Sequence, residues 1–125
     1  MGYDLHITRA SAWPFSEGAP ILQSEWELVA EAHPVLSAGG TIEWADIVPQ
    51  REYVIPGVKA GIAWRKGKID IWGEFPDRLF EIAAEIAEAL SAHLVGDDHE
   101  RYRRDGTSYE VDWVEPESGL DDDLY

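Results

Sequence analysis

The chain has 125 residues, of which 45% are hydrophobic, so it is long enough and apolar enough to fold around one core. Its 25 acidic residues outnumber its 10 Lys and Arg, and the formal net charge of −15 argues against binding to nucleic acid or an anionic membrane and favours a basic partner. The absence of cysteine excludes disulfides, thiol nucleophiles and cysteine-based zinc sites.

The first part of the chain predicts a strand followed by a helix. Apolar and polar residues alternate over residues 3–8, which is the pattern of a half-buried strand. Prolines, serines and a glycine predict a loop over residues 11–20. Ser24 and Glu27 then match a capping box, which predicts a short helix over residues 24–33.

A second strand is predicted over residues 41–48. Ile42 and Trp44 alternate there with polar and small residues. Glycines at 39–40 interrupt the chain before this segment, and Pro49 is expected to end it because proline cannot donate to a strand ladder.

The clearest local signal is a β-hairpin whose turn lies at residues 66–67, Lys-Gly. A two-residue turn at that pair places Trp64 opposite Ile69 and Ile62 opposite Ile71. All the bulky apolar residues of the hairpin then share one face, and the other face carries mostly polar residues.

A long helix is predicted over residues 76–93, since Pro76 suits a first helical turn. Its apolar stripe consists of Leu79, Ile82, Ala83, Ile86 and Leu90. Residues 94–95 are expected to start a short strand. A turn at residues 105–106 precedes the last alternating strand, residues 109–113.

The order of these elements is strand, helix, three strands, helix, two strands, or β-α-β-β-β-α-β-β. It predicts an α+β fold in which an antiparallel β-sheet carries both helices packed on one face. The second face of the sheet is then available for function. We expect one domain over residues 1–114 and an acidic C-terminal tail over residues 115–125.

No complete catalytic constellation is visible, and we expect no catalytic site, metal site or cofactor. Asp4 and His6 share one face of the first predicted strand, but residues two apart on a strand do not normally touch. The acidic run at residues 97–100 lacks the spacing of a calcium loop and is predicted to be a solvated turn. His33 and His93 are each expected at a helix C-terminus, where a cation favours the helix dipole.

Charge patterning points to more specific candidates. Asp77, Glu81, Glu85 and Glu88 are spaced by four, four and three residues, so they lie on one side of the predicted long helix. An ordinary solvated face is the simpler interpretation, and a preformed surface for a basic partner is the functional one. From Asp105 onward the chain has eight acidic residues and no basic one, which favours the functional interpretation.

Six tryptophans are many for this length. Four of them fall on predicted core faces: Trp26, Trp44, Trp64 and Trp113. Trp72 differs, because the hairpin register places it on the polar face above Gly61. It either covers that glycine or anchors a partner.

Three segments resemble a group of small uncharacterised bacterial proteins. Residues 1–9 (MGYDLHITR) match the near-identical strand with which that group begins, and residues 21–26 (ILQSEW) are similar to its helix start, Ile-Ser-x-Glu-Glu-Trp. Residues 94–98 (LVGDD) resemble its Gly-Asp-Asp/Glu segment after a long helix. The resemblance implies neither an activity nor a site residue.

These features favour a small acidic binding protein, most concretely an immunity protein that neutralises a bacterial toxin by covering its basic active surface. A nuclease is the kind of toxin that such an acidic surface suits. The expected contact residues are Asp77, Glu81, Glu85, Glu88 and Trp72. No signal peptide and no apolar stretch long enough for a transmembrane helix is visible, so we expect a cytoplasmic protein.

Two alternatives belong to other classes. One is a stand-alone enzyme or ligand-binding domain that uses the free sheet face, with His6 and Asp4. The other is a structural protein that associates with itself, as a homodimer, through the exposed face of the hairpin.

Overall fold

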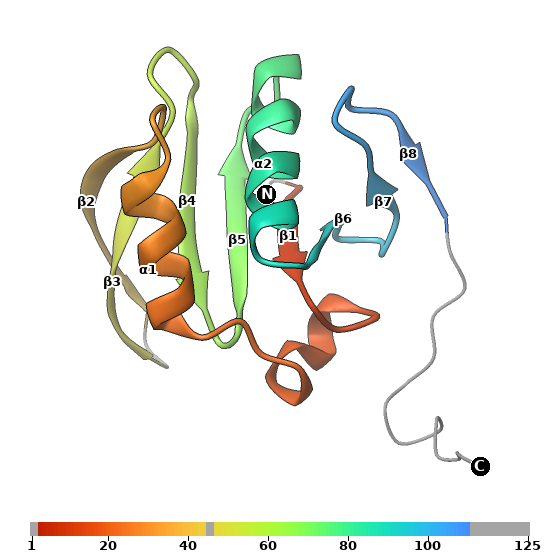
Figure 1. Ribbon diagram of the computed structural model, residues 1–125, viewed down its shortest axis with the longest axis horizontal. Coiled ribbons are helices and arrows are strands. Elements are labelled where there is room, and N and C mark those ends of the chain that lie inside the picture. Colours follow the sequence, from red (N-terminus) through yellow and green to blue (C-terminus); the bar gives the residue numbers. More distant parts are fainter. Residues whose placement is uncertain (1–2, 45–46, 111–125) are drawn as a thin grey trace.

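One antiparallel sheet organises the computed structural model, which describes residues 3–44 and 47–110 (Figure 1). Within these residues eight strands pair in the order β2-β3-β4-β5-β1-β6-β7-β8. They are β1 (Leu5–Thr8), β2 (Ser37–Trp44), β3 (Ile47–Val54), β4 (Ala60–Arg65), β5 (Lys68–Gly73), β6 (His93–Gly96), β7 (Arg101–Tyr102) and β8 (Ser108–Tyr109). The helices are α1 (Gln23–Ala32) and α2 (Asp77–Ala89), and a 3-10 helix, η1 (Trp13–Gly18), follows β1.

The predicted α+β fold is confirmed, and both helices lie on the same face of the sheet (Figure 1). The strand count differs from the prediction, because one extra strand lies between the helices and one extra strand follows α2. Residues 111–113 of the predicted last strand, with Trp113, the expected domain end at residue 114 and the acidic tail lie outside the described residues. No helix of the described ranges combines the length and apolar character that crossing a membrane requires.

The hydrophobic core fills the space between the sheet and the two helices. The predicted stripe of α2 is buried in full: Leu79, Ile82, Ala83, Ile86 and Leu90. Its spacing of three and four residues keeps these side chains on one side of the helix. From α1, Trp26 is only 2% exposed and meets Tyr53 of β3 edge to face. The sheet contributes Leu5 and Ile7 from β1, among others.

The central hairpin has the predicted register. Trp64 pairs with Ile69 and Ile62 with Ile71. The turn residues Lys66 and Gly67 both have positive φ, 53° and 86°, as a two-residue hairpin turn requires. The register that the local turn chemistry predicts is therefore the one found between β4 and β5.

Two predictions about the region between α1 and β4 are wrong. The glycines at 39–40 do not interrupt the chain but lie inside β2, and Pro49 lies inside β3 rather than ending a strand. The pairing of β2 with β3 is irregular at both places, between Ala38 and Thr41 and between Ile42 and Trp44. Pro49 sits opposite the second irregularity, where a regular ladder hydrogen bond is not needed.

The predicted cap of α1 is also wrong by two residues. Leu22, not Ser24, is the N-cap residue, and its backbone N–H donates to the Glu25 carboxylate at 2.9 Å. Glu25 is held in this place by Arg9, whose guanidinium donates to both of its oxygens at 2.9 and 3.0 Å. This bidentate contact lowers the pKa of Glu25 and outweighs the local preference for Ser24 as the cap.

The long helix is shorter than predicted at its C-terminal end. It ends at Ala89, so His93 is the first residue of β6 rather than part of the last helical turn. Ser91 has a positive φ of 54°, which reverses the chain direction after the helix and returns it to the sheet.

Replacing Gly61 of β4 by alanine is expected to destabilise the fold by about 1–3 kcal/mol, the usual cost of overpacking. A Cβ atom there would lie 2.2 Å from Glu52 Oε2 and 2.5 Å from the Trp72 ring. Urea denaturation measures the difference. Gly40→Ala is the matched control, because nothing lies within 4 Å of its Cβ position. Equal effects of the two substitutions would show that the close approach of Trp72 is unimportant.

Candidate functional site

A buried histidine lies on the sheet face opposite the helices. Leu5 and Ile7 of β1 point into the core, so His6 between them points to the other side. His6 is paired with Asp70 of β5 on one flank and Val95 of β6 on the other. The antiparallel register thus places an aspartate directly beside the imidazole, across 64 residues of sequence.

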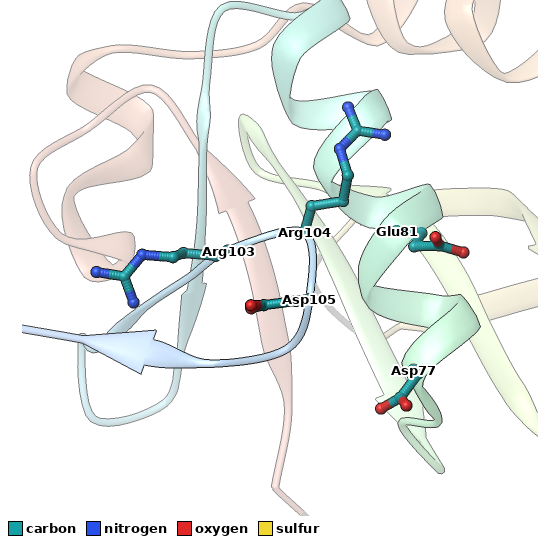
Figure 2. A pocket seen from close by; sticks show the side chains of 5 residues that line it. All are labelled: Asp77, Glu81, Arg103, Arg104 and Asp105. Atoms are coloured by element: carbon teal, nitrogen blue, oxygen red, sulfur yellow. The ribbon is translucent and has the colours of Figure 1, made fainter.

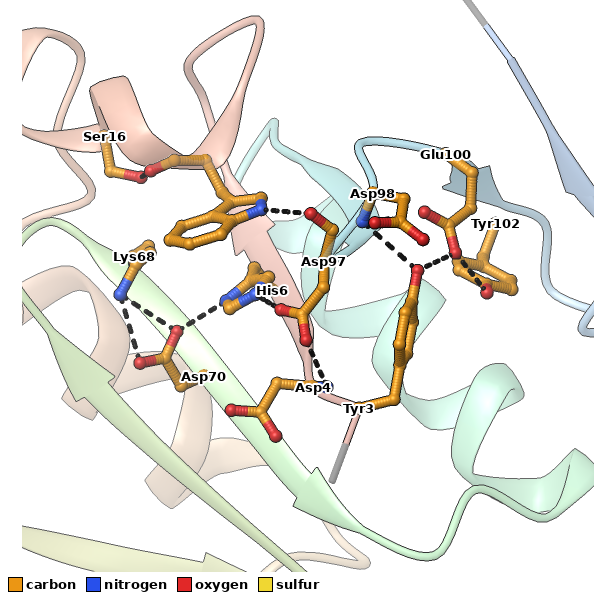
Figure 3. Close-up of polar contacts among 11 residues, drawn as sticks. Tyr3, Asp4, His6, Ser16, Lys68, Asp70, Asp97, Asp98, Glu100 and Tyr102 are labelled. Carbon is orange, nitrogen blue, oxygen red and sulfur yellow. Dashed lines mark hydrogen bonds and ion pairs between the residues drawn. The ribbon is translucent and has the colours of Figure 1, made fainter. Parts of the chain in front are cut away.

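Each ring nitrogen of His6 contacts a different carboxylate (Figure 3). Nδ1 lies 2.8 Å from Asp70 Oδ1, and Nε2 lies 2.7 Å from Asp97 Oδ1. Lys68 Nζ lies 3.0 Å from both oxygens of Asp70. His6, Lys68 and Asp70 are only 4%, 7% and 7% exposed, so this group of charges is largely withdrawn from water.

Trp13 of η1 covers the imidazole. Its ring stacks on His6 with the centroids 4.4 Å apart and an interplanar angle of 18°. Its indole N–H donates to the backbone oxygen of Asp97 at 3.1 Å. The His99 ring also stacks near Trp13, with the ring centroids 6.2 Å apart. The expectation of an open second sheet face therefore fails around His6, where η1 folds back over the strands.

Two nearby carboxyls respond to this environment in opposite ways. Burial raises the pKa of Asp70, but the hydrogen bond with His6 and the charge of Lys68 outweigh it, so the net shift is downward. Burial and the neighbouring charge of Asp97 raise the pKa of Asp4. The Asp4 backbone N–H donates to Asp97 Oδ2 at 3.0 Å, and His6 takes its hydrogen-bond partners from β5 and from the turn after β6 instead of from Asp4.

A carboxylate-flanked imidazole is the usual unit of general acid–base catalysis, but that role needs a ring nitrogen within reach of a substrate. Both nitrogens of His6 are already engaged, and Trp13 covers the ring. Among the described residues no three His, Asp or Glu side chains are grouped so that they could hold a metal ion. The arrangement suits a structural tie between β1, β5 and the turn at residues 97–99.

A second polar cluster lies beside this tie, around Glu100. The hydroxyls of Tyr3 and Tyr102 both donate to Glu100 Oε2 (Figure 3). Although burial raises the pKa of Glu100, these two hydrogen bonds lower it overall. Burial and the hydrogen bond to Glu100 raise the pKa of Tyr3 from 10.0 to about 12, and the pKa of Tyr102 is raised for the same reasons.

Tyr3 and Tyr102 are expected to lose their protons at a higher pH than an ordinary tyrosine does. Because the pKa of Tyr3 is higher in the folded state, its contribution to stability is complete below pH 10 and is lost as the pH rises towards about 12. Glu100→Gln removes the neighbouring charge and should shift the tyrosinate absorbance to lower pH. Glu110→Gln, at an exposed position, should leave the titration unchanged. An unchanged titration for Glu100→Gln would contradict this assignment.

The four acidic residues predicted on the long helix all lie on the exposed side of α2. Glu85 and Glu88 have an internal partner, because the Arg104 guanidinium lies 3.3 Å from a carboxylate oxygen of each. Glu85 also contacts His33 Nε2 at 3.1 Å. The side chains of Asp77 and Glu81 make no hydrogen bond or ion pair with any other described residue.

A surface hollow of about 460 Å³ lies between α2 and the loop after β7. It is lined by Asp77, Glu81, Arg103, Arg104 and Asp105. Figure 2 shows Arg104 running alongside α2, whereas Arg103 points away from the helix. Arg103 lies over the ring of Tyr109 at 4.4 Å. The hollow is therefore bordered by the two α2 carboxylates that lack a partner among the described residues.

Trp72, the fifth predicted contact residue, lies elsewhere. It is paired with Gly61, and it alternates with the buried core residue Ile71, so it lies on the sheet face opposite α2. Its indole ring fills the space above Gly61. The expectation that Trp72 covers this glycine is therefore met. The structure brings the four acidic residues together but does not bring Trp72 to them.

Sequence reasoning does not reveal the partners of His6. The hairpin register predicts that Lys68 and Asp70 share a face, but nothing local indicates that β1 lies beside β5. The predicted turn around Asp97 is present, but the expectation that its acidic side chains are solvated is wrong for Asp97, which contacts His6, and for Glu100, which accepts hydrogen bonds from two tyrosines. No signal in the sequence marks Trp13 as the residue that covers the imidazole.

Comparisons with known proteins found no relative of this chain. No protein-family model, no curated protein and no solved structure matches the chain.

Proposed function

We propose that this chain is a small acidic binding protein, most concretely an immunity protein that neutralises a bacterial toxin by covering its basic active surface. The observation that carries the proposal is the exposed acidic side of α2, in a chain whose net charge is −15. Such a surface attracts a basic partner from a distance and disfavours acidic ones. A toxin nuclease fits this description, because its active surface must be basic to hold nucleic acid.

The contacts within the protein divide the acidic side of α2 into two parts. Glu85 and Glu88 already receive a guanidinium, that of Arg104, at 3.3 Å. Asp77 and Glu81 border the hollow beside Arg103 and Asp105. We therefore place the first contact with a basic partner at the N-terminal half of α2, where the carboxylates can pair with incoming lysines or arginines.

Trp72 does not lie on the same side of the protein as the four acidic residues of α2. Because it lies on the opposite sheet face, it cannot belong to one flat interface with α2. Its role in covering Gly61 accounts for its position without a partner protein. The proposed interface consists of Asp77, Glu81, Glu85 and Glu88, and Trp72 belongs to it only if the partner wraps around the sheet edge.

Growth rescue tests the proposal. The chain is produced together with the product of each gene that lies next to its own, in cells that such a product otherwise stops from growing. Rescue by the unmodified chain, and not by an unrelated acidic protein of similar size, supports the proposal. Failure to rescue growth against every neighbouring product would remove it.

A further inference from the structure

A hollow of about 190 Å³ between the C-terminal half of α2 and the strands β6, β7 and β8 is locally basic. Among the described residues that line it, Arg101, Arg103 and Arg104 are basic and Glu88 is acidic. Three of the ten Lys and Arg of the chain therefore gather in one place, although the chain has 25 acidic residues. Because Glu88 already pairs with Arg104 at 3.3 Å, the lining leaves two positive charges unbalanced.

The guanidinium of Arg101 makes no hydrogen bond or ion pair with any other described residue. Its Nε is withdrawn from water and has no hydrogen-bond partner there. Arg103, in contrast, lies over the Tyr109 ring at 4.4 Å and donates to Thr107 Oγ1 at 3.3 Å. An arginine is seldom withdrawn from water unless an anion accepts its hydrogen bonds, because an unpartnered buried donor costs free energy. The surroundings of Arg101 therefore point to an anionic ligand.

His93 of β6 stands next to Arg101 of β7. Arg101 is paired with Val95, and His93 lies two residues before Val95 on the same face of β6, so Arg101 and His93 are diagonal neighbours. Partial burial and the charge of Arg101 lower the pKa of His93, so at neutral pH the neutral ring has one N–H to donate. His93 makes no hydrogen bond with any other described residue. The two side chains can therefore donate together to one acceptor group.

We propose that Arg101, His93 and Arg103 bind the phosphate group of a small molecule. A guanidinium offers two parallel N–H groups, which match two oxygens of a phosphate. The two unbalanced positive charges suit a phosphate, which carries nearly two negative charges at neutral pH, better than a carboxylate with one. The net charge of −15 disfavours a polyanion such as nucleic acid, and the hollow has room only for a small ligand. This site is separate from the proposed acidic interface on α2 and does not depend on it.

NMR titration of the full chain with inorganic phosphate, at constant ionic strength, tests the site. Phosphate should shift the signals of the Arg101 Nε–H and of the His93 ring until they saturate. It should also raise the pKa of His93, because its negative charge offsets that of Arg101, and leave the pKa of His33 unchanged. Acetate should bind at least about 10-fold more weakly. A nucleoside monophosphate that binds more tightly than inorganic phosphate would identify a phosphorylated metabolite as the ligand, and equal binding would identify the free ion.

Substitution of Arg101 separates this site from general attraction of anions. Arg101→Gln should weaken phosphate binding by about 10- to 100-fold, as expected for the loss of one charged donor. Arg101→Lys keeps the charge but not the paired N–H groups, so it should restore only part of the affinity. Arg78→Gln, at an exposed position of α2, makes the same change in net charge and should leave binding unchanged.

Three results would overturn the proposal. One is the absence of a saturable shift at Arg101 and His93 in the unmodified chain. Another is binding of acetate as tight as that of phosphate. The third is an equal loss of phosphate binding in Arg101→Gln and Arg78→Gln. If a variant does not fold, the titrations of the unmodified chain with phosphate and acetate decide the question.

Discussion

Replacing His6 by alanine is expected to lower the free energy of unfolding by about 2–5 kcal/mol, because it leaves a cavity in a buried site and removes a hydrogen-bond partner from Asp70 and from Asp97. Asp70 and Lys68 would remain buried with a gap beside them, and Asp97 would lose the ring that holds its turn. Trp13 would also lose the surface on which it stacks. Chemical denaturation monitored by circular dichroism measures the difference in unfolding free energy.

The matched control for this loss is Glu88→Ala on α2. The Glu88 side chain is 73% exposed and forms an ion pair with Arg104 on the surface, so we expect a change within about 0.5 kcal/mol. An effect of His6→Ala as small as that of Glu88→Ala would mean that the buried network does not stabilise the fold, and the structural role assigned to it would be wrong.

Reversing two charges on α2 is expected to have the largest effect on binding. Asp77→Lys combined with Glu81→Lys should slow association with a basic partner by about 10- to 100-fold, since steering by charge acts mainly on the association rate. Dissociation should change less. Stopped-flow or surface-based kinetics with a partner found among the products of adjacent genes, at two salt concentrations, would show the effect shrinking as salt screens the charges.

The other helix supplies a control with the same change in net charge. Glu27 and Glu31 of α1 are exposed and four residues apart, so Glu27→Lys combined with Glu31→Lys repeats the alteration at a different place. We expect a much smaller reduction in the association rate. Equal reductions for the two pairs would mean that overall charge, and not the α2 surface, attracts the partner.

The parts of the fold that are predicted correctly are those that local chemistry specifies. The hairpin of β4 and β5 needs only the Lys66–Gly67 turn and an alternating pattern on either side of it. The stripe of α2 needs only a spacing of three and four residues, from Leu79 to Leu90. In both cases the residues that determine the structure are close together in sequence.

The incorrect predictions concern places where contacts between residues distant in sequence determine the local structure. Arg9 shifts the start of α1 by holding Glu25, and no pattern near Ser24 reveals this contact. Pro49 is tolerated inside β3 because the pairing with β2 is irregular at that point. Such contacts depend on which elements become neighbours, so the alternation of apolar and polar residues does not predict them.

In the candidate sites, too, the features set by local spacing are predicted and those set by long-range contacts are not. The acidic side of α2 follows from helical spacing alone, and its four residues share one exposed side. Its partial neutralisation by Arg104 depends on the loop after β7 returning to the helix. The His6 network depends on β1 lying between β5 and β6, an arrangement of the sheet that the order of elements along the chain leaves open.

The central claim, that the acidic α2 surface serves a basic protein partner, is tested most directly by calorimetric titration of the unmodified chain with the purified product of each adjacent gene. We predict a one-to-one complex with a Kd in the nanomolar range that weakens as salt is added. Absence of binding to every neighbouring product, or binding that is insensitive to salt, would contradict the account.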